Sequence, residues 1–290
     1  MLAEELFRQT SNQPLCEIIF MDDGSSSETL SINQWMKSEP GIGYFELGKN
    51  VGRAAIRNRL AAKANGDNIL FLDDDSLIEN PNFIKNYLEA IDNESVICGG
   101  RTYTPKLMDR KYALHWRYGS KIESKSAEER NEAPYESFHS NNFIIPKKVW
   151  NEVPFDENLT QYGHEDTLLG FELSHKEYPV RHIDNSVIHG QLETNAEFLA
   201  KTKMALQNLN VLYHRGNGDF NDSVKLLRTF DHLDQYSGIT SFLEKLYLKN
   251  GKRWEEKLAN SRRPSLRLFG LYKLCYLSHL MHTSPKFSSK

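Results

Sequence analysis

Three consecutive carboxylates, Asp73, Asp74 and Asp75, directly follow the apolar run Ile69–Leu72. The apolar run predicts a buried strand, and the carboxylates stand where that strand leaves its sheet. Ligands of open α/β sheets bind at this edge. Adjacent negative charges repel one another unless a cation holds them, and carboxylate oxygens suit Mg²⁺ or Mn²⁺, usually shared with phosphates. The triplet therefore indicates a divalent metal site; the alternative is a solvated acidic turn before a helix.

A second acidic pair, Asp22 and Asp23, ends the β-prone segment Glu17–Met21 just before Gly24. A carboxylate at this place can accept the imide N–H of a uracil or bind ribose hydroxyls. The alternative is that it caps the helix that follows, which a residue of Ser25–Ser27 could also do.

Two arginines, Arg53 and Arg57, are four residues apart near the start of an Ala-rich helix, and so they share one helix face. A helix N-terminus with two guanidinium groups suits a diphosphate. A solvated basic face is the competing interpretation.

Two further segments carry groups that could act in catalysis. His189 closes a short strand before Gly190, and an imidazole ligand would favour Mn²⁺ over Mg²⁺. The alternative is a hydrogen-bonded structural histidine.

Glu165 and Asp166 begin a helix, whose N-terminus favours ionised carboxylates. Either one could act as a general base, or Asp166 could simply cap the helix.

The elements that must position these residues alternate between strand and helix in the first half of the chain. This order predicts an α/β protein with a doubly wound, mostly parallel sheet flanked by helices. The polar segment 120–136 has almost no large apolar residue, and we expect a mobile loop there. From about Glu193 the pattern is helical, so we expect a catalytic domain over residues 1–190 and a helical C-terminal extension over 191–290.

Bulk composition narrows the class of protein. The chain has 290 residues with a formal net charge of −3, so no global field favours nucleic acid. It contains no uninterrupted apolar run of membrane-spanning length and no signal-peptide pattern. Its three cysteines are far apart and match no zinc or disulfide spacing. We expect a cytoplasmic protein, with a peripheral position at the inner face of the membrane as the second interpretation.

Several motifs occur in a fixed order that is informative as a set. They are Asp22-Asp23-Gly24-Ser25, Asn50-Val51-Gly52-Arg53 with Arg57-Asn58, Asp73-Asp74-Asp75, Ser140-Asn141-Asn142, Tyr162-Gly163-His164-Glu165-Asp166 and Val187-Ile188-His189. This set resembles the family 2 glycosyltransferases of the GT-A fold over about residues 2–190.

The resemblance implies a role for each matching residue. The donor nucleotide would contact Asp22, Asp23, Arg57, Asp73 and Asp74. The metal, Mn²⁺ or Mg²⁺, would be held by Asp73, Asp75 and His189. Asp166 would be the general base, and Glu165 would hold a sugar. The implied reaction is inverting transfer from a nucleotide sugar, UDP-linked, to a glycan or lipid-linked acceptor.

The sequence departs from the family pattern at its start, because the apolar strand that normally comes first is absent. We expect a truncated start rather than a true loss.

The segment 262–281 mixes basic and apolar residues. We expect a helix docked on the catalytic domain, with peripheral membrane contact as the second interpretation.

Two other functions are considered. One is a non-catalytic nucleotide-sugar-binding protein. The other is a haloacid dehalogenase-type phosphatase, which is disfavoured because the Asp motif is not on the first strand. A Rossmann dehydrogenase has little support, because no glycine fingerprint follows a strand.

Overall fold

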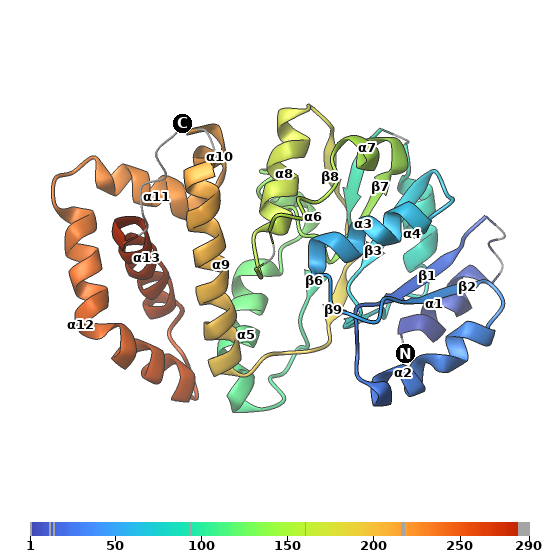
Figure 1. The fold of residues 1–290 in the computed structure, drawn as a ribbon, viewed down its shortest axis with the longest axis horizontal. Helices are drawn as coiled ribbons and strands as arrows, with labels where there is room; N and C mark the ends of the chain where they lie inside the picture. Colours follow the sequence, from blue (N-terminus) through green and yellow to red (C-terminus); the bar gives the residue numbers. More distant parts are fainter. Residues whose placement is uncertain are drawn as a thin grey trace. The chain divides into compact units, whose positions relative to one another are not determined.

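The computed structural model describes residues 2–11, 13, 15–92, 94–159, 161–215 and 218–283 (Figure 1). The chain forms two compact units. The first contains Met1–Arg101, Lys125–Thr160 and Leu168–Gly190, and the second contains Thr102–Ser124, Gln161–Thr167 and Gln191–Lys290. The segments 102–124 and 161–167 therefore belong with the C-terminal helices.

The strands form three sheets, of order β1-β2, β3-β7-β5-β8 and β4-β9-β6. Their bounds are β1 (Ile18–Asp22), β2 (Ile42–Glu46), β3 (Asn68–Leu72), β4 (Ser76–Leu77), β5 (Val96–Cys98), β6 (Arg101–Thr102), β7 (Asn142–Pro146), β8 (Val180–His182) and β9 (Val187–His189).

Helices of the first unit are α1 (Leu2–Thr10), α2 (Ser27–Asn33), η1 (Gln34–Ser38), α3 (Arg53–Lys63), α4 (Phe83–Ala90), α6 (Ala127–Asn131) and α7 (Lys147–Glu152). Those of the second are η2 (Arg110–Tyr112), α5 (Ala113–Tyr118), η3 (Gly119–Glu123), α9 (Asn195–Arg215), α10 (Gly218–Ser223), α11 (Lys225–Asp234), α12 (Ile239–Asn260) and α13 (Leu266–Thr283). Helix α8 (Glu165–His175) has residues in both units.

The central strands of the first unit alternate their side chains between two core layers. On β3, Ile69 and Phe71 pack into one cluster with the helix residues Ala54 and Trp150. The intervening Leu70 and Leu72 pack into a second cluster with residues of α1 and α4. Because side chains of a strand point to opposite faces in turn, both faces of this sheet are covered by helices. The α/β class is confirmed.

Strand pairing is mixed, whereas the sequence favoured mostly parallel pairing. β1 pairs in parallel with β2, and β5 with β8. Strand β7 lies between β3 and β5 and is antiparallel to both. Its five residues are all buried, as expected for a strand covered on both faces. The apolar stretch within it, Phe143–Ile145, carries no signal of strand direction.

The expectation of a mobile loop over residues 120–136 was wrong. Helix α6 begins with a capping box in which Ser126 and Glu129 exchange side-chain and backbone hydrogen bonds. Arg130 on that helix is 3% exposed. The composition of residues 120–136 did not predict the packing of α6, because the residue that α6 buries is an arginine rather than an apolar one.

The second unit is helical, with a core of Leu114, Leu199, Leu258, Phe269 and Tyr272. Helices α12 and α13 supply three of these residues, so α13 turns its apolar side toward the protein. In the described part of the chain, no helix combines the length and the apolar character needed to cross a bilayer.

Candidate functional site

The Asp73–Asp75 triplet lies where β3 turns into β4. The backbone N–H of Asp73 donates to the carbonyl of Asn141 (3.1 Å), which continues the β3–β7 pairing by one residue. The N–H of Ser76 then donates to the carbonyl of Asp73 (3.1 Å), so the chain reverses direction tightly. Three carboxylates are thereby confined to one turn at the end of a buried strand.

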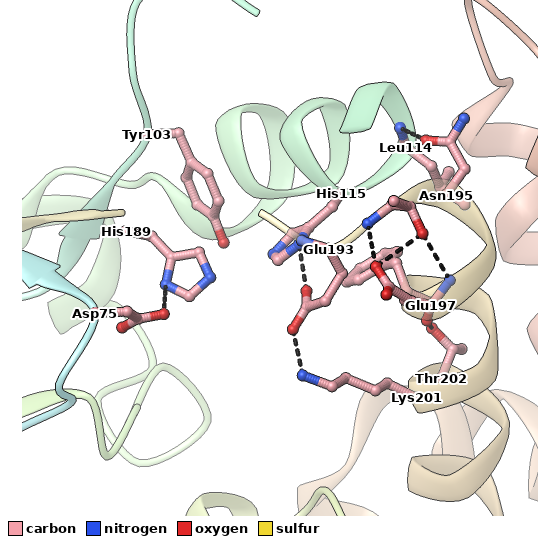
Figure 2. A network of polar contacts seen from close by, with 12 residues as sticks. Asp75, Tyr103, Leu114, His115, His189, Glu193, Asn195, Glu197, Lys201 and Thr202 are labelled. Carbon is pink, nitrogen blue, oxygen red and sulfur yellow. Dashed lines mark hydrogen bonds and ion pairs between the residues drawn. The ribbon is translucent and has the colours of Figure 1, made fainter. Parts of the chain in front are cut away.

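His189 is brought to Asp75 by the pairing of β4 with β9, in which Ser76 lies opposite His189. The His189 Nδ1 atom lies 3.2 Å from Oδ2 of Asp75 (Figure 2). The N–H of Gly190 donates to the Asp75 carbonyl (2.8 Å), and a Cβ on Gly190 would lie 2.5 Å from that oxygen. Only glycine allows this approach without a shift of the backbone.

Asp75 also carries an atom whose hydrogen-bonding capacity is unused within the described residues. Its Oδ1 is buried and accepts no hydrogen bond from that part of the chain. A buried carboxylate oxygen without a donor is costly, and such atoms call for an ion or another ligand. The pair of Asp75 and His189 thus has the donor chemistry of a divalent metal site.

Arg57 from α3 forms an ion pair with Asp73, with 2.6 Å between Nη2 and Oδ1. Arg57 is 8% exposed, and its guanidinium lies over the Phe155 ring at 5.3 Å. The arginine therefore neutralises one carboxylate of the triplet. Burial, together with the charges of Asp75 and Asp73, raises the pKa of Asp74. The turn retains excess negative charge, which a cation would offset.

Asp22 and Asp23 at the end of β1 have distinct structural partners. Asp22 accepts hydrogen bonds from the N–H groups of Gly24 (2.9 Å) and Ser25 (2.8 Å). Burial alone would raise the pKa of Asp22, but these hydrogen bonds hold that pKa below its usual value. Asp23 accepts from the N–H groups of Val51 (2.7 Å) and Gly52 (3.2 Å), and so it fixes the loop that opens α3.

Glu165 and Asp166 begin α8 and belong to the second unit. The loop before them has left-handed backbone at Gly163 and His164. Asn208 of α9 donates to the carbonyls of Gln161 (2.8 Å) and Gly163 (2.9 Å), which anchors that loop. Asp166 accepts the N–H of Thr167 (2.8 Å). Both carboxylates therefore stand on a firmly held helix start, where the helix dipole favours negative charge.

The second unit contains a partly buried ionic cluster that no sequence motif predicted. His115 on α5 and Lys201 on α9 both pair with the carboxylate of Glu193 (Figure 2). The His115 ring stacks on Phe198 at 4.5 Å. Burial alone would raise the pKa of Glu193, but hydrogen bonds and charges from His115 and Lys201 lower it to about 2. Neither His115 nor Glu193 stands in a recognisable motif, so only the fold reveals the cluster.

Of the residues predicted from sequence, Arg57, Asp73, Asp75 and His189 come together in the first unit. Asp74 lies in the same turn. Asp22 and Asp23 lie at the end of another strand and hold backbone turns. Glu165 and Asp166 lie together in the second unit.

Comparison with known proteins identifies the class. The model of the family "Glycosyl transferase family 2" matches residues 2–153. The chain belongs to this family and is a glycosyltransferase. It is 23% identical to a cholesterol galactosyltransferase of Borreliella burgdorferi over 244 residues, which are 78% of this chain and 68% of that protein. Over 85 residues, 29% of this chain and 34% of the other, it is 35% identical to an uncharacterized glycosyltransferase of Haemophilus influenzae.

Solved structures share the fold. A mannosyltransferase from Pyrobaculum calidifontis, in complex with GDP-Man and Mn²⁺, matches with a TM-score of 0.56 at 11% identity, covering 97% of this chain and 82% of that one. TarS residues 1–349 from S. aureus, in complex with UDP, matches with a TM-score of 0.51 at 16% identity, covering 97% and 85%. These likenesses confirm the GT-A fold, and family membership sets the phosphatase and dehydrogenase interpretations aside.

Proposed function

We propose that this glycosyltransferase uses a divalent metal and transfers a sugar from a UDP-linked donor, with inversion, to a glycan or lipid-linked acceptor. The observation that carries the proposal is the buried Oδ1 of Asp75, which accepts no hydrogen bond from the described residues and lies on a carboxylate paired with His189. A P. calidifontis neighbour solved with Mn²⁺ and a nucleotide sugar adds support.

The residues proposed to hold the metal are Asp73, Asp75 and His189. Two carboxylates and one imidazole form a mixed oxygen and nitrogen donor set, which favours Mn²⁺ over Mg²⁺. When bound, the ion would offset the charge of the donor diphosphate and of the departing nucleoside diphosphate. Arg57 would hold Asp73 in place and limit repulsion within the triplet, since it already forms an ion pair with that carboxylate.

The nucleotide is proposed to lie at the carboxyl ends of β1 and β3, with contacts from Asp22, Asp23, Arg57, Asp73 and Asp74. Asp23 would act chiefly through the loop it holds at the start of α3. Helix starts bind phosphate well because their N–H groups and dipole favour anions.

Asp166 is proposed as the general base. It would take the proton of the acceptor hydroxyl while the oxygen attacks the anomeric carbon, and the bond to the diphosphate would break on the opposite face. One such displacement inverts the anomeric centre. Glu165, 8% exposed at the same helix start, is proposed to hold a sugar hydroxyl.

A thermal melt with UDP or GDP, each with and without Mn²⁺, tests the donor site. A nucleotide at about 100 times its dissociation constant should raise the free energy of unfolding by roughly 2.7 kcal/mol. We expect a shift with UDP and Mn²⁺ together that Asp75→Ala abolishes and the exposed control Asp67→Ala retains.

Each other outcome of the thermal melt would contradict a different part of the proposal. A larger shift with GDP would overturn the choice of UDP, and equal shifts with and without Mn²⁺ would overturn the metal. No shift with either nucleotide would contradict the proposed donor site as a whole.

A further inference from the structure

The solvent-facing side of α12 is strongly cationic. Its exposed residues recur every three or four positions, and so they lie on one face of the helix. Five of them are basic: Lys245, Lys249, Lys252, Arg253 and Lys257. The protein as a whole has a formal net charge of −3, so this concentration of positive charge is local.

The acids of α12 do little to neutralise that face. Glu244 pairs with His279 (3.4 Å) and His282 (2.9 Å) of α13. Glu255 pairs with Lys203 of α9 (3.1 Å) and accepts a hydrogen bond from the Tyr272 hydroxyl (2.7 Å). Glu256 is the remaining acid of the helix, and it is exposed. The outer face therefore carries five positive charges against one negative charge.

Two large apolar side chains stand among these cations. Phe242 is 61% exposed and Leu248 is 64% exposed. Lys245 lies one helical turn after Phe242, and Lys249 lies one turn after Lys245. An exposed aromatic and an exposed aliphatic side chain flanked by lysines on one helix face are typical of a helix that lies on a lipid surface.

Helix α13 is a poorer candidate for contact with a lipid surface. Its residues Phe269, Tyr272, Cys275 and Leu277 are at most 1% exposed, because they pack inside the second unit. The arginines just before and within its first turn, Arg262, Arg263 and Arg267, are exposed and add further positive charge.

We propose that the outer face of α12 docks on the surface of a bilayer that contains anionic lipids. The lysines and arginines would lie at the level of the headgroups, with their aliphatic stems along the interface. Phe242 and Leu248 would enter the boundary of the acyl chains. Each basic residue near an anionic surface contributes a similar small increment, so affinity grows with their number and falls as salt screens them.

Vesicle sedimentation of the full chain tests this proposal without any assay of glycosyl transfer. We expect binding to vesicles of phosphatidylcholine mixed with phosphatidylglycerol, weaker binding as salt rises, and little binding to phosphatidylcholine alone. The triple variant Lys249→Glu/Lys252→Glu/Arg253→Glu should bind the anionic vesicles about a hundredfold more weakly. Phe242→Ser/Leu248→Ser should reduce the binding that persists at high salt.

A matched control separates this face from overall charge. Lys106→Glu/Lys121→Glu/Lys148→Glu changes three exposed lysines elsewhere by the same total charge, and it should bind as the unmodified protein does. Equal loss in both triple variants, or equal binding to both kinds of vesicle, would overturn the proposal. Binding of soluble polyphosphate through the same residues, without vesicle binding, would also overturn it in favour of a polyanion site. None of these outcomes depends on the nucleotide melt described above.

Discussion

Asp166 is the residue on which the proposed chemical step depends. In Asp166→Asn the side chain keeps its shape and can still accept the Thr167 N–H, but it can no longer take a proton. We expect kcat for UDP release from UDP-sugars to fall by about 10²- to 10⁴-fold, the usual contribution of a general base. The melting shift with UDP and Mn²⁺ should stay unchanged, because donor binding does not use the base.

Glu172→Gln provides a control on the same helix, as it removes a carboxylate that has no proposed role. It should keep kcat near the value of the unmodified protein. If Asp166→Asn retains full kcat, another group takes the acceptor proton, and the assignment of Asp166 is wrong.

Gly190 determines how closely β9 approaches the Asp75 turn. A Cβ at this position would lie 2.5 Å from the Asp75 carbonyl oxygen, so Gly190→Ala must displace the backbone beside His189. Since Asp75 and His189 are the proposed ligands, we expect the Mn²⁺-dependent part of the UDP melting shift to decrease by more than half.

Gly270→Ala is the matched control. Apart from its chain neighbours and the backbone of its own helix, no atom of the described residues lies within 4 Å of a Cβ built there, and the residue is exposed on α13. Alanine in that helix should stabilise the protein by about 0.5–1 kcal/mol and leave the Mn²⁺ response unchanged. An unchanged Mn²⁺ response in Gly190→Ala would show that the spacing of β9 from the turn does not matter to metal binding.

At the scale of elements, two neighbouring residues join α6 to the sheet. Asn131 exchanges hydrogen bonds with the backbone N–H and carbonyl of His182 (2.9 Å each), and the buried Arg130 makes four more. Arg130 donates to the carbonyls of Gly99 (3.2 Å), Ile183 (2.7 Å) and Lys125 (2.6 Å), and its Nε donates to Nδ1 of His182 (3.1 Å). A single side chain thereby ties α6 to the ends of β5 and β8. Burial lowers the pKa of Arg130, yet four hydrogen bonds compensate the guanidinium.

Removal of that guanidinium should be costly. Arg130→Met would remove four hydrogen bonds and leave Nδ1 of His182 without a donor, while the Gly99 and Ile183 carbonyls would keep only the Asn185 N–H. We expect a loss of about 2–4 kcal/mol in the free energy of unfolding. Arg130→Lys should lose less, because it keeps the charge and some of the bonds. Urea denaturation measures both, with the exposed Arg110→Met as control. A loss below about 1 kcal/mol in Arg130→Met would contradict the role given to this residue.

Chain segments whose structure is set locally could be predicted from the sequence. The apolar run before the Asp triplet is β3, and the carboxylates do stand at its end, because strand pattern and polar terminus are adjacent in sequence. The position of His189 opposite Ser76 depends on a register between distant segments, for which only the family resemblance gave a signal.

Neither a local sequence pattern nor the family resemblance indicated that Arg130 is buried or that His115 pairs with Glu193. A charged residue reads as solvated unless its partners are known, and those partners are backbone carbonyls or side chains far along the chain. For the same reason the antiparallel direction of β7 could not be inferred from its apolar composition.

At the scale of the whole molecule, the buried His182 and the half-buried His164 should make stability depend on pH. Burial lowers the pKa of His182 to about 4; the Pro134 carbonyl opposes this shift and the charge of Arg130 adds to it. Burial also lowers the pKa of His164 to about 4; the charge of Asp166 opposes this shift and that of Lys273 adds to it. In the unfolded chain both histidines titrate near 6.5.

The unfolded chain therefore binds more protons than the folded protein between pH 6.5 and 4. Stability should be level above pH 6.5, fall as the pH decreases toward 4, and lose nothing more from these groups below it. At pH 5.5 each histidine should cost on the order of 1 kcal/mol. Glu193, with its pKa lowered to about 2, contributes stability that is lost only below about pH 4.5, so the two effects occupy different pH ranges.

Urea denaturation at pH 7.5 and pH 5.5 measures this difference. His182→Gln and His164→Asn should each reduce it by about half, since neither replacement titrates in this range. Asparagine suits position 164 because the backbone there is left-handed, with φ of 68°. The exposed control His232→Gln should leave the difference unchanged. Equal stability of the unmodified protein at the two pH values would mean that these histidines are protonated in the fold, and that the burial inferred for them does not exclude their charged form.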